Sequence, residues 1–422
     1  MKRNLMSALG VFATAGLIAA PLSAATITGS LLQTFTQQPT DNFARFGEGL
    51  AGVGNDVVVG GQFAHVADVF SASTGALVTT IPSPNPTAND FFGFSAAASG
   101  STVFLSAPGD ASIAANAGVI YQYNPTNGNL LQTIRSPVPT AAAEFGYSMA
   151  VSGSNLLVGG HDGFSLPPPV YLLNATTGNS LLTFVDPVTN ASDNFGSSIA
   201  FVGNNVLIGA PANQSGTAIP GLAYLFSGTT GALLHTFQDP NLGAGNWFGL
   251  SVTAWGSNIL IGAPQDASSG SPNGAAYLFD GTTGALLHTY YNPTGGGAYF
   301  GSELATLGGD ALIGAAGYQG ANDGGAFFGF SPSSQLLWTT RNPNEVANTD
   351  FGYYLATDGA NFLAGADLAG PFDSGIAYEF EGPPVVPEPS TWALLALGGL
   401  ALGGLAISKR RARRAALAVT QY

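Results

Sequence analysis

Short apolar runs separated by turn residues recur along the chain at a nearly constant spacing. Each unit opens with a Phe-Gly pair, and an apolar run closes with a small residue 14 positions after the Phe. Successive Phe residues of these pairs are 46 to 53 positions apart: Phe46, Phe92, Phe145, Phe195, Phe248, Phe300 and Phe351. A period of about 50 residues built from short strands is typical of a propeller blade.

The fourth unit shows the expected strands most clearly. Phe195–Ala200 alternates in hydrophobicity, and Asn205–Ala210 is a continuous apolar run. Ala223–Phe226 and Leu233–Phe237 follow and are separated by a Thr-Gly turn. Four short strands that are apolar on both faces predict a sheet covered on both sides, which is what stacked blades provide.

The two ends of the repeat region complement each other. The seventh unit ends with Ala377–Phe380 and has no fourth strand before a proline-rich segment. Thr28–Phe35 matches Thr283–Tyr290 and precedes the first Phe-Gly without any partner of its own. We therefore predict an all-β, seven-bladed β-propeller in which Leu31–Phe35 closes the last blade and leaves no exposed edge.

The termini predict a route out of the cell. Residues 1–25 have two basic residues, an apolar stretch and small residues before the expected cleavage site, as secretory signal peptides do. Residues 26–382 form the predicted propeller, and 383–389 form a proline-rich linker. Residues 390–408 are apolar and would be about 28 Å long as a helix, enough to span a bilayer. The basic tail, 409–422, is expected to stay cytoplasmic.

This C-terminal order resembles the PEP-CTERM sorting signal of Gram-negative bacteria. The residues that carry the resemblance are Pro387, Glu388, Pro389, Arg410, Arg411, Arg413 and Arg414. It implies an exosortase, a membrane enzyme that cuts near Pro-Glu-Pro and releases or transfers the mature protein to the envelope exterior. The expected location is the cell surface or the extracellular space, after transient anchoring in the inner membrane by the C-terminal helix.

The repeats resemble FG-GAP units, the propeller units of integrin α-subunits. The match is best where Phe195-Gly196 is followed by Gly209-Ala210-Pro211 and where Phe248-Gly249 is followed by Gly262-Ala263-Pro264. That family often has an Asp-x-Asp-x-Asp-Gly-like calcium loop. The corresponding loops here hold one carboxylate each, whereas calcium needs six to eight oxygens, so no metal site is expected. These carboxylates are Asp110, Asp266, Asp323 and Asp373.

Composition excludes several classes of function. Residues 26–388 contain three basic residues against all 24 acidic ones, so nucleic acid is not an expected partner. The chain has no cysteine, which excludes thiol catalysis and thiolate metal sites. Its four histidines lack the spacing of a zinc site, and no cofactor is expected. They are His65, His161, His235 and His288.

Two kinds of function remain open. Five acidic residues lie just before a Phe-Gly. They are either rim carboxylates of a glycoside hydrolase or lyase, or recurrent turn residues before a strand, and we favour the second interpretation. They are Asp41, Asp90, Glu144, Asp193 and Asp350. No catalytic constellation stands out, and no serine-nucleophile motif occurs in a strand-to-helix context. We therefore favour a non-enzymatic binding or structural propeller that associates with exopolysaccharide or envelope proteins, with a secreted glycosidase or lyase as the alternative.

Overall fold

The computed structural model describes residues 29–37, 44–87, 89–161, 167–188, 193–212, 220–241, 245–268, 273–294, 299–316, 324–344, 349–369 and 374–382. The predicted signal peptide, Pro-Glu-Pro linker, membrane span and basic tail lie outside these residues. Asp41, Asp323 and Asp373 also lie outside them.

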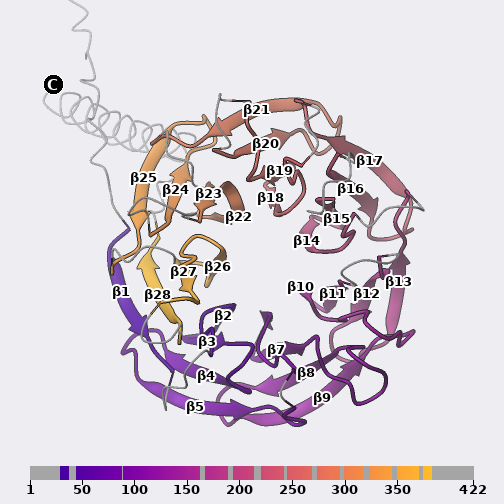
Figure 1. Cartoon of the computed structure of the whole chain (residues 1–422), viewed down its shortest axis with the longest axis vertical. Helices are drawn as coiled ribbons and strands as arrows, with labels where there is room; N and C mark the ends of the chain where they lie inside the picture. Colours follow the sequence, from indigo (N-terminus) through magenta and orange to yellow (C-terminus); the bar gives the residue numbers. More distant parts are fainter. Residues whose placement is uncertain are drawn as a thin grey trace, which may run out of the picture.

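The described residues form seven four-stranded antiparallel sheets around a central axis and contain no helix (Figure 1). The seven-bladed β-propeller expected from the repeat is therefore confirmed. In blades 1 to 6 the strands follow chain order from the axis outwards, and the first strands of neighbouring blades pack around the channel.

The strands of the first four blades have the following bounds. Blade 1 has β2 (Gly49–Val53), β3 (Asp56–Gly60), β4 (Val66–Ser71) and β5 (Leu77–Pro82). Blade 2 has β6 (Ala96–Ser99), β7 (Thr102–Ala107), β8 (Val119–Asn124) and β9 (Asn129–Arg135). Blade 3 has β10 (Ser148–Ser152), β11 (Asn155–Gly159), β12 (Val170–Asn174) and β13 (Ser180–Phe184). Blade 4 has β14 (Ser198–Val202), β15 (Asn205–Ala210), β16 (Leu222–Ser227) and β17 (Leu233–Gln238).

The remaining three blades complete the ring. Blade 5 has β18 (Val252–Trp255), β19 (Asn258–Ala263), β20 (Ala275–Phe279) and β21 (Leu286–Tyr291). Blade 6 has β22 (Phe300–Leu307), β23 (Asp310–Ala315), β24 (Ala326–Phe330) and β25 (Leu336–Arg341). Blade 7 has β26 (Tyr354–Thr357), β27 (Asn361–Ala366), β28 (Ile376–Glu381) and β1 (Leu31–Phe35).

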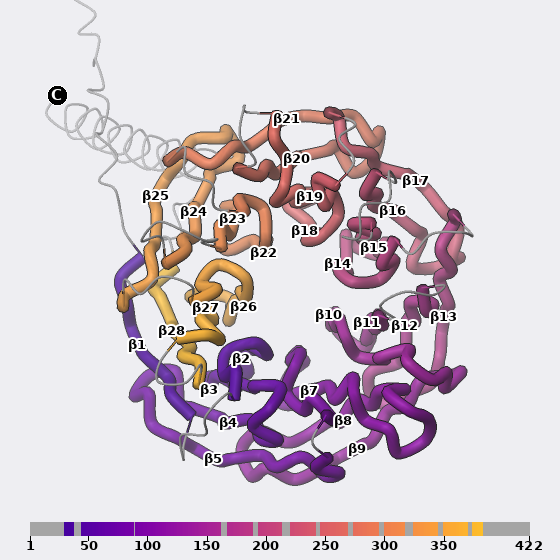
Figure 2. The backbone as a smooth tube through the Cα atoms, viewed as in Figure 1, coloured from indigo at the N-terminus to yellow at the C-terminus, as the bar shows by residue number. Residues whose placement is uncertain are grey.

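The N-terminal strand closes the ring as predicted. Strand β1 pairs antiparallel with β28, with Leu31 opposite Phe380 and Phe35 opposite Ala377. In Figure 2 the indigo start of the chain lies beside its yellow end. Phe35 is 1% exposed and packs at 5.0 Å from the ring of Phe70 in blade 1. The latch therefore pairs the edge of β28 and also joins the hydrophobic core.

The Phe-Gly pair is a turn before the first strand in blade 4, not its start. The sequence predicted a strand from Phe195, but β14 begins at Ser198 because Gly196 has φ 92°, in the left-handed region. Phe195 is fully buried. The next blade's glycine, Gly249, offers its carbonyl to Ser198 Oγ at 2.8 Å, and a Cβ on Gly209 would collide with that carbonyl. This contact explains why a small residue follows each Phe after 14 positions.

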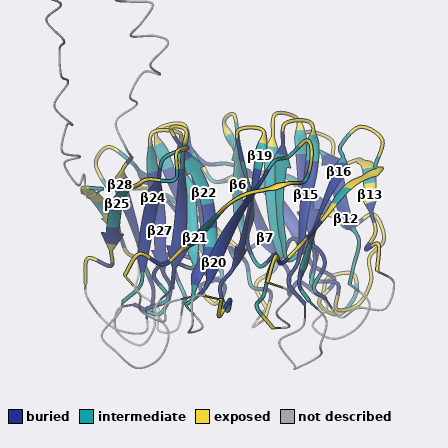
Figure 3. Cartoon of the chain, turned by 90° about the horizontal axis from the view of Figure 1, so that it is seen from above, coloured by how far each residue is buried: buried dark blue, intermediate teal, exposed yellow. Residues whose placement is uncertain are grey.

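The two faces of the propeller differ in the loops that they carry. The Phe-Gly turns, the connections between second and third strands and the links between blades lie at one end, which we call the loop face. The short hairpin turns lie at the other end, which we call the turn face (Figure 3). Strand β1 starts, and β28 ends, at the turn face. The propeller is thus joined to the rest of the chain at that face.

Candidate functional site

The residue before each Phe-Gly adopts a left-handed backbone conformation in all seven blades. The φ values lie between 42° and 59°, although none of these residues is glycine. Such a conformation costs about 1–2 kcal/mol per residue. Because it recurs in every blade, it belongs to the fold, and what differs between blades is the side chain that the turn presents on the loop face. These residues are Arg45, Phe91, Glu144, Asn194, Trp247, Tyr299 and Asp350.

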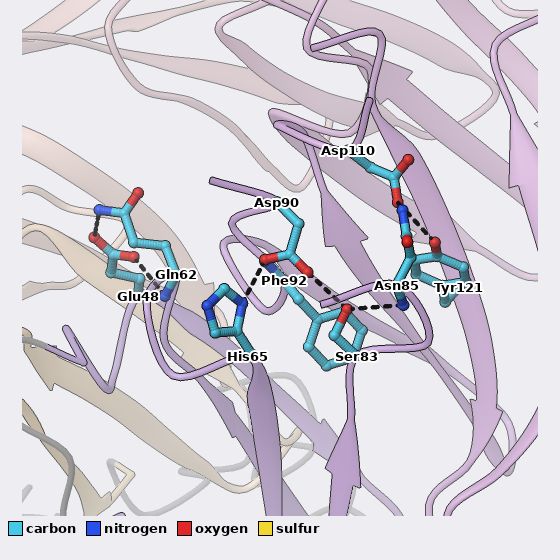
Figure 4. Close-up of polar contacts among 9 residues, drawn as sticks. All are labelled: Glu48, Gln62, His65, Ser83, Asn85, Asp90, Phe92, Asp110 and Tyr121. Carbon is cyan, nitrogen blue, oxygen red and sulfur yellow. Dashed lines mark hydrogen bonds and ion pairs between the residues drawn. The ribbon is translucent and has the colours of Figure 1, made fainter. Parts of the chain in front are cut away.

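A buried polar cluster occupies this face where blades 1 and 7 meet. Glu48 is 5% exposed, and its Oε1 accepts a hydrogen bond of 2.8 Å from Gln62 Nε2 (Figure 4). Its other carboxylate oxygen accepts the Gln62 backbone N–H at 3.3 Å. Arg45 Nη1 lies 3.4 Å from Glu48 and 3.9 Å from Asp367 of blade 7. The Tyr354 hydroxyl donates to Glu48 at 3.5 Å.

Two carboxyl groups of the channel favour the protonated form. Burial and then the charge of Asp367 raise the pKa of Glu48 to about 8, against the opposing effect of Arg45. Glu303 lines the channel and is half-buried. Its desolvation there raises its pKa to about 8. At pH 7 both groups are therefore mostly neutral and able to donate a hydrogen bond.

Aromatic side chains join neighbouring blades around the same face. The rings of Trp247 and Tyr299 stack at 5.8 Å with an interplanar angle of 7°. Phe94 and Tyr147 lie 4.9 Å apart, and Tyr147 in turn stacks on His161 at 4.7 Å. Phe63 and Phe91 form an edge-on pair at 5.5 Å (ring centroids throughout). Phe63 is 41% exposed, so part of this aromatic surface faces solvent.

Two of these residues, Phe94 and Tyr147, line the loop-face end of the central channel. This end is a hollow of about 350 Å³ whose described lining holds two carboxylates, Glu48 and Glu303, along with six serines and four aromatic residues. We call this hollow, together with the loop-face pairs Trp247–Tyr299 and Phe63–Phe91, the mouth. A further hollow of about 500 Å³ continues along the inner strands towards the turn face and is lined mainly by small residues. The serines and aromatics of the mouth are Ser95, Ser148, Ser197, Ser198, Ser251, Ser302, Phe94, Tyr147, Tyr353 and Tyr354.

The four described acidic residues that were considered as rim carboxylates do not gather at one rim. Glu144 and Asp350 are half-buried on the loop face, and Glu144 lies 3.5 Å from His161. Asp90 and Asp193 are 0% and 2% exposed because they turn inward between blades. Each accepts the backbone N–H two residues later, from Phe92 at 3.3 Å and from Phe195 at 3.1 Å, so for these two the turn interpretation is confirmed and the rim interpretation is wrong. The sequence analysis missed Glu48, although an acidic residue two positions after the Phe is unique to the first unit.

Both oxygens of the buried Asp90 carboxylate in blade 2 have polar partners. Asp90 accepts a hydrogen bond from Ser83 Oγ at 2.7 Å and lies 2.7 Å from His65 Nδ1 (Figure 4). Nearby, Tyr121 donates to Asp110 at 2.9 Å, and Asn85 donates to the same oxygen at 3.2 Å. Burial opposes ionisation of Asp110, but its hydrogen bonds prevail and lower its pKa. These groups stabilise the packing of adjacent blades.

The polar residue in the middle of the outer strand has a structural role in two blades. The ring of His235 contacts the Thr282 carbonyl of the next blade at 2.9 Å, and Gln33 contacts the Ser73 carbonyl in the equivalent way. Across the described ranges, no three His, Cys, Asp or Glu side chains lie close enough to hold a metal ion as a group. Within those same ranges, no helix is long and apolar enough to cross a membrane.

Comparison with known families agrees with the repeat and with the C-terminal pattern. Residues 183–226 and 239–279 match the FG-GAP repeat, and residues 385–411 match the PEP-CTERM protein-sorting motif. No curated protein matches the chain. The matched repeats run from the end of β13 to β16 and from the link after β17 to β20. The chain thus carries FG-GAP repeats within a seven-bladed propeller and a PEP-CTERM sorting motif, which implies an exported protein processed by an exosortase-type enzyme.

Proposed function

We propose that this protein is exported to the cell surface or extracellular matrix, where the mouth binds uncharged glycan segments of exopolysaccharide or related envelope components. The arrangement of the mouth is the observation that carries the proposal. Sugar rings present apolar C–H faces and many hydroxyl groups. Stacked aromatic rings such as Trp247 and Tyr299 suit the apolar faces, and Ser, Gln and neutral carboxyl groups suit the hydroxyls.

Charge narrows the class of ligand. Residues 26–388 contain three basic residues against 24 acidic ones, and of the three Arg45 lies near the mouth. The net negative charge of this region repels a polyanion at long range and so disfavours it as a ligand. Because Glu48 and Glu303 are mostly protonated at neutral pH, the mouth itself adds little negative charge. An uncharged polysaccharide fits both features.

The position of the chain ends supports an outward-facing mouth. Strands β1 and β28 leave the propeller at the turn face, opposite the mouth. While the span at 390–408 anchors the chain, the mouth would point away from the membrane. Cleavage near Pro387-Glu388-Pro389 would then release the propeller from this anchor. Intact-mass spectrometry of the protein from its native host tests the step, because a mature chain that still contains residues 392–422 would mean that the signal is only an anchor.

A glycan array combined with a reducing-sugar release assay tests the proposed function. The propeller, residues 26–382, is expected to retain uncharged glycans without shortening them. Trp247→Ala is expected to weaken retention about tenfold, the loss of one aromatic contact worth about 1.4 kcal/mol. Retention that is equal for wild type and variant, or absent from all glycans, would refute the proposal.

A glycosidase or lyase is the second candidate, and Glu48 is the observation that favours it. A carboxyl group with a pKa of about 8 beside Asp367 has the protonation state of a general acid. If this candidate is correct, reducing ends accumulate with wild type and not with Glu48→Gln. If the binding proposal is correct, neither protein releases sugar.

A further inference from the structure

At the junctions that lead into blades 2, 4, 5 and 7, three polar side chains occupy equivalent positions on the loop face. The first position lies two residues after the last buried residue of the outer strand of one blade. The second lies two residues before the Phe of the next Phe-Gly pair. The third is on the third strand of the blade that this pair begins. In blade 2 these residues are Ser83, Asp90 and Tyr121. In blade 4 they are Asp186, Asp193 and Tyr224.

The junction of blade 2 shows how a buried carboxylate is normally satisfied. Ser83 and the ring of His65 contact opposite oxygens of Asp90, and Asn85 and Tyr121 both donate to Asp110 (Figure 4). Each carboxylate here faces a neutral donor or an imidazole. No second acid opposes it.

The junctions of blades 5 and 7 use amide donors. Asn246 donates to Asp239 at 2.5 Å, and Asn241 donates to the Tyr277 hydroxyl at 2.6 Å. In blade 7, Asn342 donates to Thr349 at 2.6 Å and Asn344 donates to Tyr378 at 2.7 Å. An asparagine two residues after the first position therefore reaches the tyrosine in both junctions.

The junction of blade 4 lacks these donors. Asp186 and Asp193 occupy the first and second positions, and Val188 stands where the other junctions have Asn85, Asn241 or Asn344. One oxygen of each acid accepts a backbone N–H, from Val188 at 2.8 Å and from Phe195 at 3.1 Å. The remaining Oδ2 atoms and the Tyr224 hydroxyl are buried without a hydrogen-bond partner among the described residues.

These three groups are close together and deeply buried. Asp186, Asp193 and Tyr224 are 8%, 2% and 1% exposed. Burial and then the charge of Asp186 raise the pKa of Asp193 to about 7, and both acids add to the effect of burial in raising the pKa of Tyr224. All three unpartnered oxygens thus belong to one buried junction, at positions whose counterparts in blade 5 include the bonded pair Asp239 and Asn246. A single ion shared by these oxygens would satisfy all three.

We propose that Asp186 Oδ2, Asp193 Oδ2 and the Tyr224 hydroxyl bind a hard divalent cation, with calcium as the best-suited ion. The donor set is oxygen only, and calcium tolerates the irregular geometry of a site whose other ligands are water or backbone carbonyls. The site bridges two blades through one link and a third strand. It differs from the one-carboxylate loops holding Asp110 and Asp266, for which no calcium was expected. The proposal is independent of glycan binding.

Thermal unfolding of the protein, purified in its exported form, tests the site at pH 8. Calcium at millimolar concentration is expected to raise the Tm of wild type by at least about 2 °C relative to chelator. Asp193→Asn supplies the amide that Asn246 supplies in blade 5, so it is expected to remain folded and to lose the calcium response. Asp239→Asn is the matched control and is expected to keep it.

A second measurement identifies the site directly. Terbium, a calcium substitute, is expected to luminesce when a nearby tyrosine is excited, and Tyr224→Phe is expected to abolish this signal. No Tm shift with calcium, magnesium or manganese would show that the acids share a proton instead and would overturn the proposal. A calcium response that persists in Asp193→Asn, or terbium luminescence that persists in Tyr224→Phe, would overturn it too.

Discussion

The turn face and the loop face are built from the same seven repeats but use them differently. On the turn face, the glycines of the hairpins between first and second strands, such as Gly153 and Gly256, have open space around them. On the loop face, the Phe-Gly glycines touch the preceding blade, and the residue before each pair differs from blade to blade. The loop face thus combines tight packing between blades with variable side chains, the combination that a rigid binding surface requires.

The closing strand provides the largest test, because both faces depend on a closed ring. Deleting residues 26–36 removes β1, exposes the edge of β28 and leaves the pocket of Phe35 empty. Loss of a buried Phe alone costs about 3–5 kcal/mol, so the Tm is expected to fall by more than about 10 °C. Calorimetry measures this change, and an unchanged Tm would show that β1 does not latch the ring.

Glycine substitutions separate the two faces by their packing. Gly249→Ala places a Cβ against the Leu222 carbonyl at a φ of 94°, whereas Gly256→Ala meets nothing within 4 Å at a φ of 63°. We expect the loop-face variant to lose about 2–4 kcal/mol and the turn-face variant about 1 kcal/mol. Urea unfolding of the pair gives both values. Equal losses would mean that contact between blades does not set the cost.

The pH dependence of stability sharpens the role of Glu48. Its pKa is about 8 in the folded protein and 4.5 as the reference, so folding favours the protonated form. This contribution is full below pH 4.5 and is lost as the pH rises through 8. Glu48→Gln is expected to unfold with a weaker dependence on pH between 5 and 9. If the two proteins follow parallel curves, Glu48 is ionised in the folded state at neutral pH.

A small effect on stability is also expected at the exposed aromatic surface. Phe63→Ala removes a 41%-exposed ring that contacts Phe91 edge-on, so we expect a loss of less than about 1.5 kcal/mol in unfolding. Exchange of Leu131 on the outer wall, which is 52% exposed, for Ala serves as the control. Only the first change is expected to weaken glycan retention. Weakened retention in both would place the ligand on the outer wall.

The sequence predicted the architecture because blade packing leaves a mark at fixed intervals. The buried Phe, the close approach of Gly249 to Gly209 and the orphan strand at 31–35 all follow from steric requirements that only a few residue types meet. These requirements repeat in each unit. Blade number and closure could therefore be derived without a structure.

The site could be predicted only in part, because side-chain direction depends on small changes of backbone conformation. Asp90 and Glu144 are one position apart in their units, yet the left-handed turn buries the first and leaves the second half-buried on the loop face. The pairing of β22 with β23 shifts between Phe300 and Leu304, so Ser302 bonds the next blade and Glu303 lines the channel. Two acids at the first and second junction positions, Asp186 and Asp193, occur in one unit only, so the repeat pattern does not predict that they share a junction.

The measurement that tests the assignment of the two faces most directly is hydrogen exchange of the propeller with and without a bound glycan. The account predicts added protection in loop-face peptides around Glu48, Tyr147 and Trp247, with none in turn-face peptides around Gly153 and Gly256. Protection confined to the hairpin turns, or spread along the outer strands, would contradict the assignment of the binding surface to the mouth.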